Sequence, residues 1–193
     1  MGGEPSVRAL WGRTVLRRRA SFTPAELDAW ATRVPPGLVA RVESAFPMQW
    51  LPATGVLALV DASEFVLGER YVSTGVDHLL GELGKPPYSA ILRGIAHASS
   101  GRERSAVGAA IEVLFATVCR DAGAMVVDVD RRGDLSIWHR TPPRAFVASR
   151  GYRMAFSYVS LAALAVVGLT GHSEGFIEDG EDLVCRVTDI SPR

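Results

Sequence analysis

Hydrophobic residues in the first two thirds of the chain recur at the spacing of helices. Thr23-Pro24-Ala25-Glu26 has the pattern of a helix start, because Thr23 can cap free backbone N–H groups and Glu26 can complete a capping box. Further helices are predicted over Leu38–Phe46, Pro52–Leu67, Val76–Leu83, Tyr88–His97 and about Arg104–Asp121. We therefore expect an N-terminal segment (1–20) and then a mainly helical part (21–123).

The period of the pattern changes after Gly123. Short runs rich in alternating β-formers, separated by turn residues, predict strands, and a long uncharged run predicts a helix. The predicted order is strands Ala124–Asp130 and Asp134–His139, a helix over about Arg144–Gly168, and strands His172–Ile177 and Asp182–Ile190. The fold class is thus α+β: one domain in which a helical part precedes a ββαββ antiparallel-sheet part (124–193).

Composition is that of an ordinary globular domain. The 193 residues are 48% hydrophobic and 22% charged, which is enough to build a core. The 21 basic residues equal the 21 acidic ones, so the net charge is zero. A nucleic-acid partner is not expected, since binding phosphates requires a basic surplus.

The sequence also predicts where the protein works. Met154–Leu169 is free of charge, but it is shorter than the ~20 apolar residues of a bilayer span and contains polar residues, so we expect a buried helix and no membrane span. The first 19 residues do not resemble a secretory signal. Two cysteines, Cys119 and Cys185, are too few for a disulfide framework. A cytoplasmic protein is expected.

One motif invites an enzymatic interpretation. Gly171–Gly175 reads GHSEG and matches the GxSxG of α/β-hydrolases. In that fold the acid and the histidine of the triad follow the serine, whereas no histidine follows Ser173 here. We expect the two glycines to flank a helix-to-strand turn instead.

No catalytic, metal or cofactor site emerges from the remaining polar residues. The four histidines lack the spacing of metal ligands and fit surface or hydrogen-bonded positions better: His78, His97, His139 and His172. Phosphate-binding glycine loops are missing from the sequence. The triplet Arg17–Arg19 is interpreted as a solvated face.

Several segments together resemble a known family. They are FTPAELDAWATRVP (Phe22–Pro35), the Trp50-Leu51-Pro52 triplet, LFATVCRDAGAMVVDVD (Leu114–Asp130) and EDGEDLVCRVTDI (Glu178–Ile190). In these the chain is similar to a paralogous family of uncharacterised proteins, abundant in myxobacteria. That family is related to the 4-vinyl-reductase-type and heme–nitric-oxide-binding-like fold, which subunits of the TRAPP tethering complex share distantly.

The resemblance implies a fold that houses small hydrophobic ligands or makes dimer contacts, often in signalling. Two departures matter. The 4-vinyl-reductase-type hairpin carries two cysteines, but only Cys185 has a counterpart here, since Phe176 or Ile177 stands at the other position. The heme-binding Tyr-x-Ser-x-Arg motif is not supplied by Tyr71–Gly75 or by Tyr152–Met154. No cofactor or metal is therefore expected.

The leading hypothesis is a non-enzymatic small-ligand-binding or sensory domain of bacterial signalling, with a small hydrophobic ligand between the helical part and the sheet. The expected lining is Trp50, Tyr71, Trp138, His139, Tyr152 and Tyr158. A second hypothesis is a module that forms homodimers or binds a protein partner. An enzyme is the least favoured, because no set of nucleophile, base and acid can be assembled.

Overall fold

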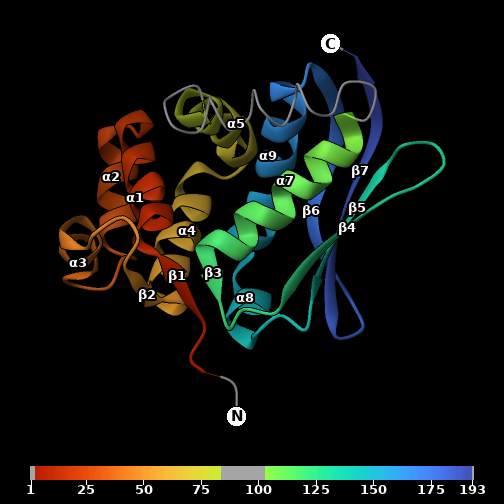
Figure 1. Cartoon of the computed structure of the whole chain (residues 1–193). Coiled ribbons are helices and arrows are strands. Elements are labelled where there is room, and N and C mark those ends of the chain that lie inside the picture. The colour runs from red at the N-terminus through yellow and green to blue at the C-terminus, as the bar shows by residue number, and fades with distance from the viewer. Residues whose placement is uncertain (1–2, 84–102, 193) are drawn as a thin grey trace.

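A computed structural model describes residues 3–83 and 103–192 of the chain. The helix predicted over Tyr88–His97 lies outside the described residues. Figure 1 shows most of the helices gathered on one side of the molecule and the strands β4 to β7 on the other.

The helices, in chain order, are α1 (Ala9–Arg17), the short 3-10 helix η1 (Arg18–Ser21), α2 (Pro24–Ala31), α3 (Leu38–Ser44), α4 (Ala53–Leu67), α5 (Arg70–Leu83), α7 (Glu103–Val118), α8 (Arg144–Ala148) and α9 (Arg150–Val166). The strands are β1 (Ser6–Arg8), β2 (Trp50–Pro52), β3 (Cys119–Arg120), β4 (Ala124–Val129), β5 (Leu135–Arg140), β6 (Leu169–Asp179) and β7 (Asp182–Pro192).

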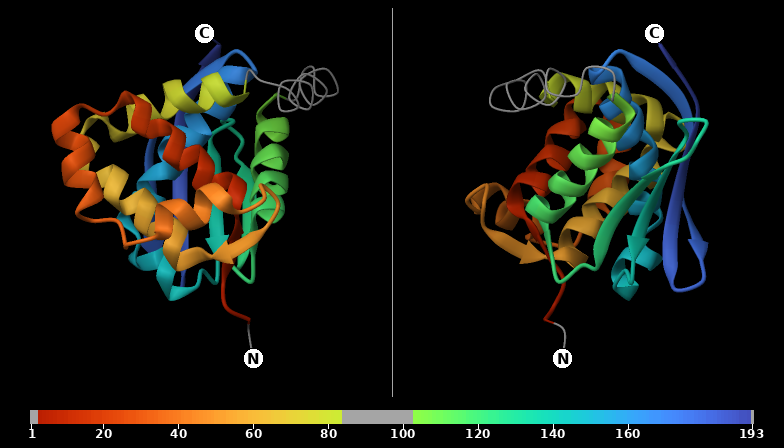
Figure 2. Two further views of the ribbon diagram at one scale, coloured as in Figure 1. Left: turned by 90° about the vertical axis from the view of Figure 1, so that its left-hand side faces the viewer. Right: turned by 45° about the vertical axis from the view of Figure 1, so that its right-hand side comes forward.

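The predicted hairpin–helix–hairpin part is confirmed as an antiparallel sheet with α8 and α9 inserted between its hairpins. Its strand order is β4-β5-β7-β6. Along β5, Leu135, Ile137 and His139 are buried, whereas the alternate residues Ser136, Trp138 and Arg140 are only half-buried. One face of the sheet therefore meets the core and the other meets solvent. Helices α7 and α9 cover the inner face (Figure 2).

Helix α9 is the centre of the molecule, because it packs on the sheet and also against α4, α5 and α7. Its start is fixed by two carboxylate contacts: Asp61 on α4 accepts hydrogen bonds of 2.8 Å from the Ser149 hydroxyl and from the Gly151 N–H. Gly151 lets the two helices touch, since a Cβ there would lie 2.6 Å from the Val60 carbonyl oxygen. The two helices are thereby held at close range.

A small second sheet was not expected from the sequence. Strand β1 lies between β2 and β3 and is antiparallel to both, joining Val7 to Leu51 on one side and to Cys119 on the other. No element was predicted for residues 1–20, yet β1 and α1 lie there and Val7, Ala9 and Leu16 are buried core residues.

Several predicted boundaries differ from those in the structure, among them the start of α5 at Arg70 and the longer span of β6. The helix expected from Arg144 to Gly168 is interrupted at Ser149, whose side chain instead caps α9 by accepting from the Tyr152 N–H. The helix expected to reach Asp121 ends at Val118, because the next residues pair with β1.

The prediction for the GxSxG motif is also wrong. Gly171–Gly175 does not flank a helix-to-strand turn but lies inside β6, where the pairing with β7 is irregular between Thr170 and His172 and between Ser173 and Phe176. The uncharged segment before it forms much of α9, and eight residues of α9 are buried in the protein. Within the two described ranges, no helix has the length and apolar character needed to cross a bilayer.

Candidate functional site

An apolar cavity of about 210 Å³ lies between α1, α7 and α9, beside the end of α5. Its lining consists almost entirely of hydrocarbon side chains. Helix α7 contributes Ala106, Val107, Ala110, Ile111 and Phe115 to this lining, and α9 contributes Tyr152, Ala155, Phe156, Val159 and Ala163. A concave, mostly apolar site with few polar groups is typical of small-molecule binding.

Small side chains explain why the space is open. Ala106 and Ala110 are one turn apart on α7, and Ala155 and Ala163 are two turns apart on α9, so each helix presents short side chains toward the other. Large residues such as Phe115 and Phe156 are buried beside these alanines and fill the space toward the sheet. The alanines thus leave a void between two well-packed helices.

One thiol lines the apolar cavity. Cys119, the first residue of β3, is buried, and this burial raises the pKa of its thiol to about 12. A neutral thiol at this position is a small apolar group rather than a nucleophile.

A second cavity of about 100 Å³ adjoins the first and has a different character. Its lining includes the buried guanidinium of Arg18 and polar side chains from four helices, namely Thr14 on α1, Ser63 on α4, Tyr71 and His78 on α5, and Tyr158 on α9. The two cavities share five lining residues, namely Trp11, Thr14, Leu79, Tyr158 and Val159. They are therefore neighbouring parts of one space.

The Arg18 side chain carries a buried charge, with 4% of the residue exposed. Its Nη2 donates to the Tyr71 carbonyl oxygen and, at 2.5 Å, to the Thr74 hydroxyl. Its Cζ lies 4.5 Å from the centroid of the Tyr71 ring and 5.3 Å from that of Tyr158. Both rings thus offer their π-electrons to the cation.

The charge of Arg18 lacks a carboxylate partner. Among the described residues no Asp or Glu oxygen lies within ion-pair distance of the guanidinium, although its neighbours Arg17 and Arg19 pair with Glu82 and Glu43. The Arg18 Nε is buried, and no described residue accepts a hydrogen bond from it. Burial lowers the pKa of Arg18, as expected where a cation has lost water and gained no anion.

The neighbouring titratable groups are also perturbed. Burial lowers the pKa of His78, whose Nε2 lies 3.0 Å from the Thr14 carbonyl oxygen and donates to it, and therefore favours the neutral imidazole. Burial raises the pKa values of Tyr71 and Tyr158, so both phenols stay protonated. Arg18 is the cation of the polar cavity, and the other groups around it are neutral.

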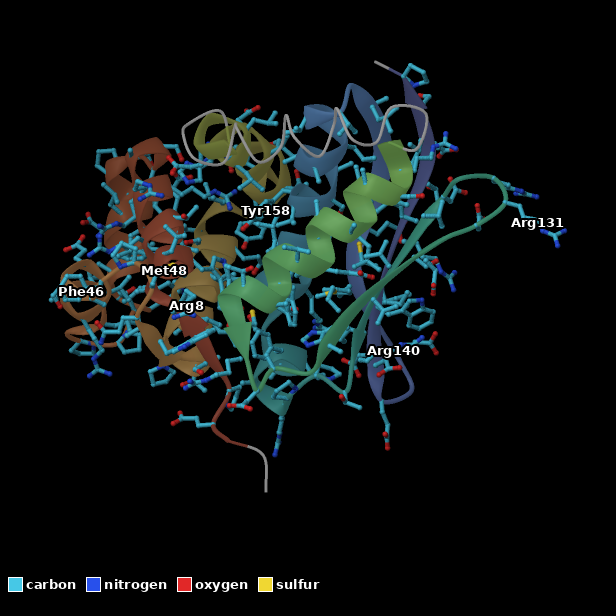
Figure 3. All side chains as sticks on the ribbon, in the orientation of Figure 1. Arg8, Phe46, Met48, Arg131, Arg140 and Tyr158 are labelled. Carbon is cyan, nitrogen blue, oxygen red and sulfur yellow. The ribbon has the colours of Figure 1, made fainter. Side chains whose placement is uncertain are left out.

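The structure brings three of the six predicted lining residues to these cavities. Tyr152 and Tyr158 line the apolar cavity, and Tyr71 and Tyr158 line the polar one, with their rings edge to face at 5.6 Å. Figure 3 shows Tyr158 in the layer between α1, α5 and α9. The Tyr71 hydroxyl donates to the Gly151 carbonyl oxygen at 3.0 Å, which ties α5 to the start of α9.

The other three predicted residues lie elsewhere. His139 is buried in the aromatic core behind the apolar cavity, where Phe115, Phe146 and Tyr152 surround it. Trp138 points to the opposite, outer face of the sheet, with the Arg140 guanidinium 4.2 Å from its ring centroid.

Trp50 lies on the small sheet, between two arginines. The Arg8 and Arg120 guanidinium carbons are 3.7 Å and 4.9 Å from its ring centroid. Neither tryptophan contributes to the cavity linings described above, so the predicted set does not come together in one place.

The GxSxG serine is a packing residue. Ser173 is buried, and its hydroxyl lies 3.2 Å from the Cys185 sulfur on the neighbouring strand. The adjacent His172 is exposed on the outer side of β6 and faces Glu174. Within residues 3–83 and 103–192, no group of three His, Cys, Asp or Glu side chains is placed to hold a metal ion.

The sequence analysis missed Arg18, which it assigned to a solvated face with Arg17 and Arg19. Trp11, Val15 and Arg18 are spaced i, i+4 and i+7, so a helix through this segment would have placed Arg18 on the apolar side. The alanine spacing on α7 and α9 is the corresponding signal for the apolar cavity.

Comparisons with protein-family models, with curated proteins and with solved structures give no match to this chain. The interpretation of the site therefore depends on its geometry and chemistry.

Proposed function

We propose that this protein is a non-enzymatic binding domain that holds a small apolar molecule between α7 and α9, in a sensory role within bacterial signalling. The observation that carries the proposal is the apolar cavity of about 210 Å³, whose lining includes short side chains on the facing helices α7 and α9. An empty apolar cavity is costly, because its walls lose contacts that a ligand would restore.

The chemistry of the lining supports binding over catalysis. Its polar groups are few, and those that could act as nucleophiles, acids or bases are restrained. The Glu82 carboxylate is paired with Arg17 at 2.5 Å, and the Cys119 thiol is neutral. The Tyr152 hydroxyl is hydrogen-bonded to the His139 imidazole at 2.9 Å, and burial keeps the Tyr158 phenol protonated by raising its pKa. Covalent and acid–base catalysis both need a group that can reach the substrate in its reactive protonation state.

The resemblance to the 4-vinyl-reductase-type and heme–nitric-oxide-binding-like fold is part of this proposal. The order hairpin, helix, hairpin in residues 124–192 and the helices stacked on one face of the sheet support it. That resemblance implies a fold that houses small hydrophobic ligands or makes dimer contacts.

A neutral fluorescent probe tests the proposal. N-phenyl-1-naphthylamine becomes brighter in apolar surroundings, and we expect one saturable site in the purified protein. Ala110→Phe would fill the cavity and weaken binding at least about tenfold, as blocking an apolar pocket removes most of its buried contact. Ala109→Phe is the matched control, because Ala109 is exposed on the same helix.

Two outcomes would count against the proposal. One is the lack of saturable binding by the unaltered protein, and the other is equal binding by the Ala110→Phe and Ala109→Phe variants. Native mass spectrometry of freshly purified protein adds a second test, since a bound cellular molecule would appear as a discrete added mass.

The alternative that the protein forms homodimers or binds a partner stays a prediction. Phe46 and Met48 are exposed by 81% and 52% near the small sheet, but scattered exposed apolar residues are normal on proteins. Equilibrium sedimentation that shows only a monomer would contradict the homodimer.

A further inference from the structure

The unpaired charge of Arg18 defines what the binding site recognises. Burying an ion is costly unless it is paired, and natural proteins place such charges where a partner or ligand supplies the opposite one. The polar cavity holds Arg18 with an unused Nε donor and with neutral Tyr71, Tyr158 and His78 around it. These neighbours cannot neutralise the cation.

The polar cavity is also positioned correctly for a ligand head group. It shares Trp11, Thr14 and Tyr158 with the apolar cavity, so a molecule that lies between α7 and α9 can extend past Tyr158 toward the guanidinium. Arg18 is rigidly held, since Nη2 is bonded to α5 and the side chain lies against the ring of Tyr71. A held guanidinium is well suited to bind an oxyanion.

We propose that the two cavities form one site for a molecule with an apolar body and a single negatively charged head group, the body lying between α7 and α9 and the head on Arg18. This inference rests on the proposed function and specifies its ligand class. It requires no covalent step, because the ligand binds by burial of its body and by hydrogen bonds from the guanidinium to its head group.

A pair of probes with the same aromatic body separates the two contributions. N-phenyl-1-naphthylamine is neutral, and 8-anilinonaphthalene-1-sulfonate has the same ring system with a sulfonate added. We expect Arg18→Met to weaken binding of the sulfonate at least about tenfold, as loss of a charge-assisted hydrogen bond does, while binding of the neutral probe changes less than about threefold.

The control variant is Arg19→Met, which removes the same charge one residue away. Arg19 pairs with Glu43 at the surface, at 2.9 Å, so we expect little change in the affinity for either probe. Arg18→Met should fold, since methionine replaces the aliphatic stem of the arginine and removes an unpaired buried cation. A melting temperature close to that of the unaltered protein, together with retained binding of the neutral probe, would show that the variant is folded.

A competition experiment on the unaltered protein makes the test independent of any variant. Naphthalene-1-acetate and 1-naphthaleneacetamide have the same shape and differ in charge. We expect the carboxylate to displace the sulfonate probe at a concentration at least about tenfold lower than the amide, by the same charge-assisted bond. Sodium sulfate at matched ionic strength should not displace it.

The outcomes distinguish this inference from the proposed function. If the neutral probe fails to bind, the proposed function fails. If the neutral probe binds but Arg18→Met weakens neither probe, or weakens both equally, water rather than a ligand satisfies the guanidinium and only the inference fails. Equal potency of carboxylate and amide, or displacement by sulfate alone, would overturn it as well.

Discussion

The imidazole Nδ1 of His139 lies 2.9 Å from the hydroxyl oxygen of Tyr152, and both side chains are buried. The other ring nitrogen of His139, Nε2, is hydrogen-bonded to the Ala122 carbonyl oxygen. A carbonyl can only accept, so Nε2 carries the proton and Nδ1 accepts from the phenol. The contact joins β5 to α9 beneath the apolar cavity with a neutral imidazole.

Removing the phenol oxygen of Tyr152 should destabilise the protein while the aromatic ring, which lines the apolar cavity, is retained. In Tyr152→Phe the Nδ1 of His139 becomes a buried acceptor without a donor, which costs about 1–3 kcal/mol in the free energy of unfolding. Urea denaturation measures the loss, and N-phenyl-1-naphthylamine binding should persist. A double-mutant cycle with His139→Phe should show coupling of about 0.5–3 kcal/mol; strictly additive effects would contradict the contact.

The stability of the protein should fall in mild acid. Burial lowers the pKa values of His139 and His78 in the folded state, so between about pH 6.5 and those lower values the unfolded chain binds more protons than the folded one. Stability that is fully present above pH ~6.5 is therefore lost as the pH decreases.

Urea titrations at a series of pH values test this dependence. The decline should be smaller in His139→Phe, which retains His78 as the second contributor. The same decline in the unaltered protein and in this variant would show that His139 does not take part.

The α4–α9 crossing should not tolerate a methyl group. Gly151→Ala places a Cβ 2.6 Å from the Val60 carbonyl oxygen, and forced separation of the helices costs about 1–3 kcal/mol. Gly81→Ala is the matched control on α5, where a Cβ meets nothing within 4 Å, so alanine should be neutral or stabilise the helix by up to ~1 kcal/mol. Thermal denaturation of both variants compares them, and similar melting temperatures would contradict the close crossing.

The Cys119 thiol should be inert in the folded protein. With its pKa raised to about 12, only about one molecule in ten thousand is a thiolate at pH 8, and the thiolate is the reactive form. Alkylation by iodoacetamide, followed by peptide mass spectrometry, should be far slower than that of free cysteine. Saturation with N-phenyl-1-naphthylamine should slow the alkylation further, because Cys119 lines the apolar cavity. Alkylation as fast as that of free cysteine would contradict the burial of the thiol.

The sheet could be predicted from the sequence because local chemistry determines it. The turn at Asp130–Gly133 uses Gly133 at a φ of 85°, and the turn after Asp179 uses Gly180 at a φ of 63°. These turn residues can be recognised in the sequence, and they set the register of the two hairpins. The capping box at Thr23 and Glu26 was predictable for the same reason and is present.

Other features depend on partners distant in sequence. Strands β1, β2 and β3 are too short to be seen as patterns, and each exists because the others pair with it. The burial of Arg18 likewise depends on contacts with α5 and α9, and within the sequence only its helical spacing with Trp11 and Val15 indicates it. Of the predicted lining residues, only the tyrosines on α5 and α9 line the cavities: Tyr71, Tyr152 and Tyr158.

The position of β7 has a consequence for how the sheet is assembled. This strand, Asp182–Pro192, lies in the interior of its sheet, between β5 and β6. It is antiparallel to both neighbours, so it joins the β4–β5 hairpin, which precedes α8 and α9, to β6, which follows them. The two hairpins therefore become one continuous surface for α7 and α9 only when β7 docks against β5.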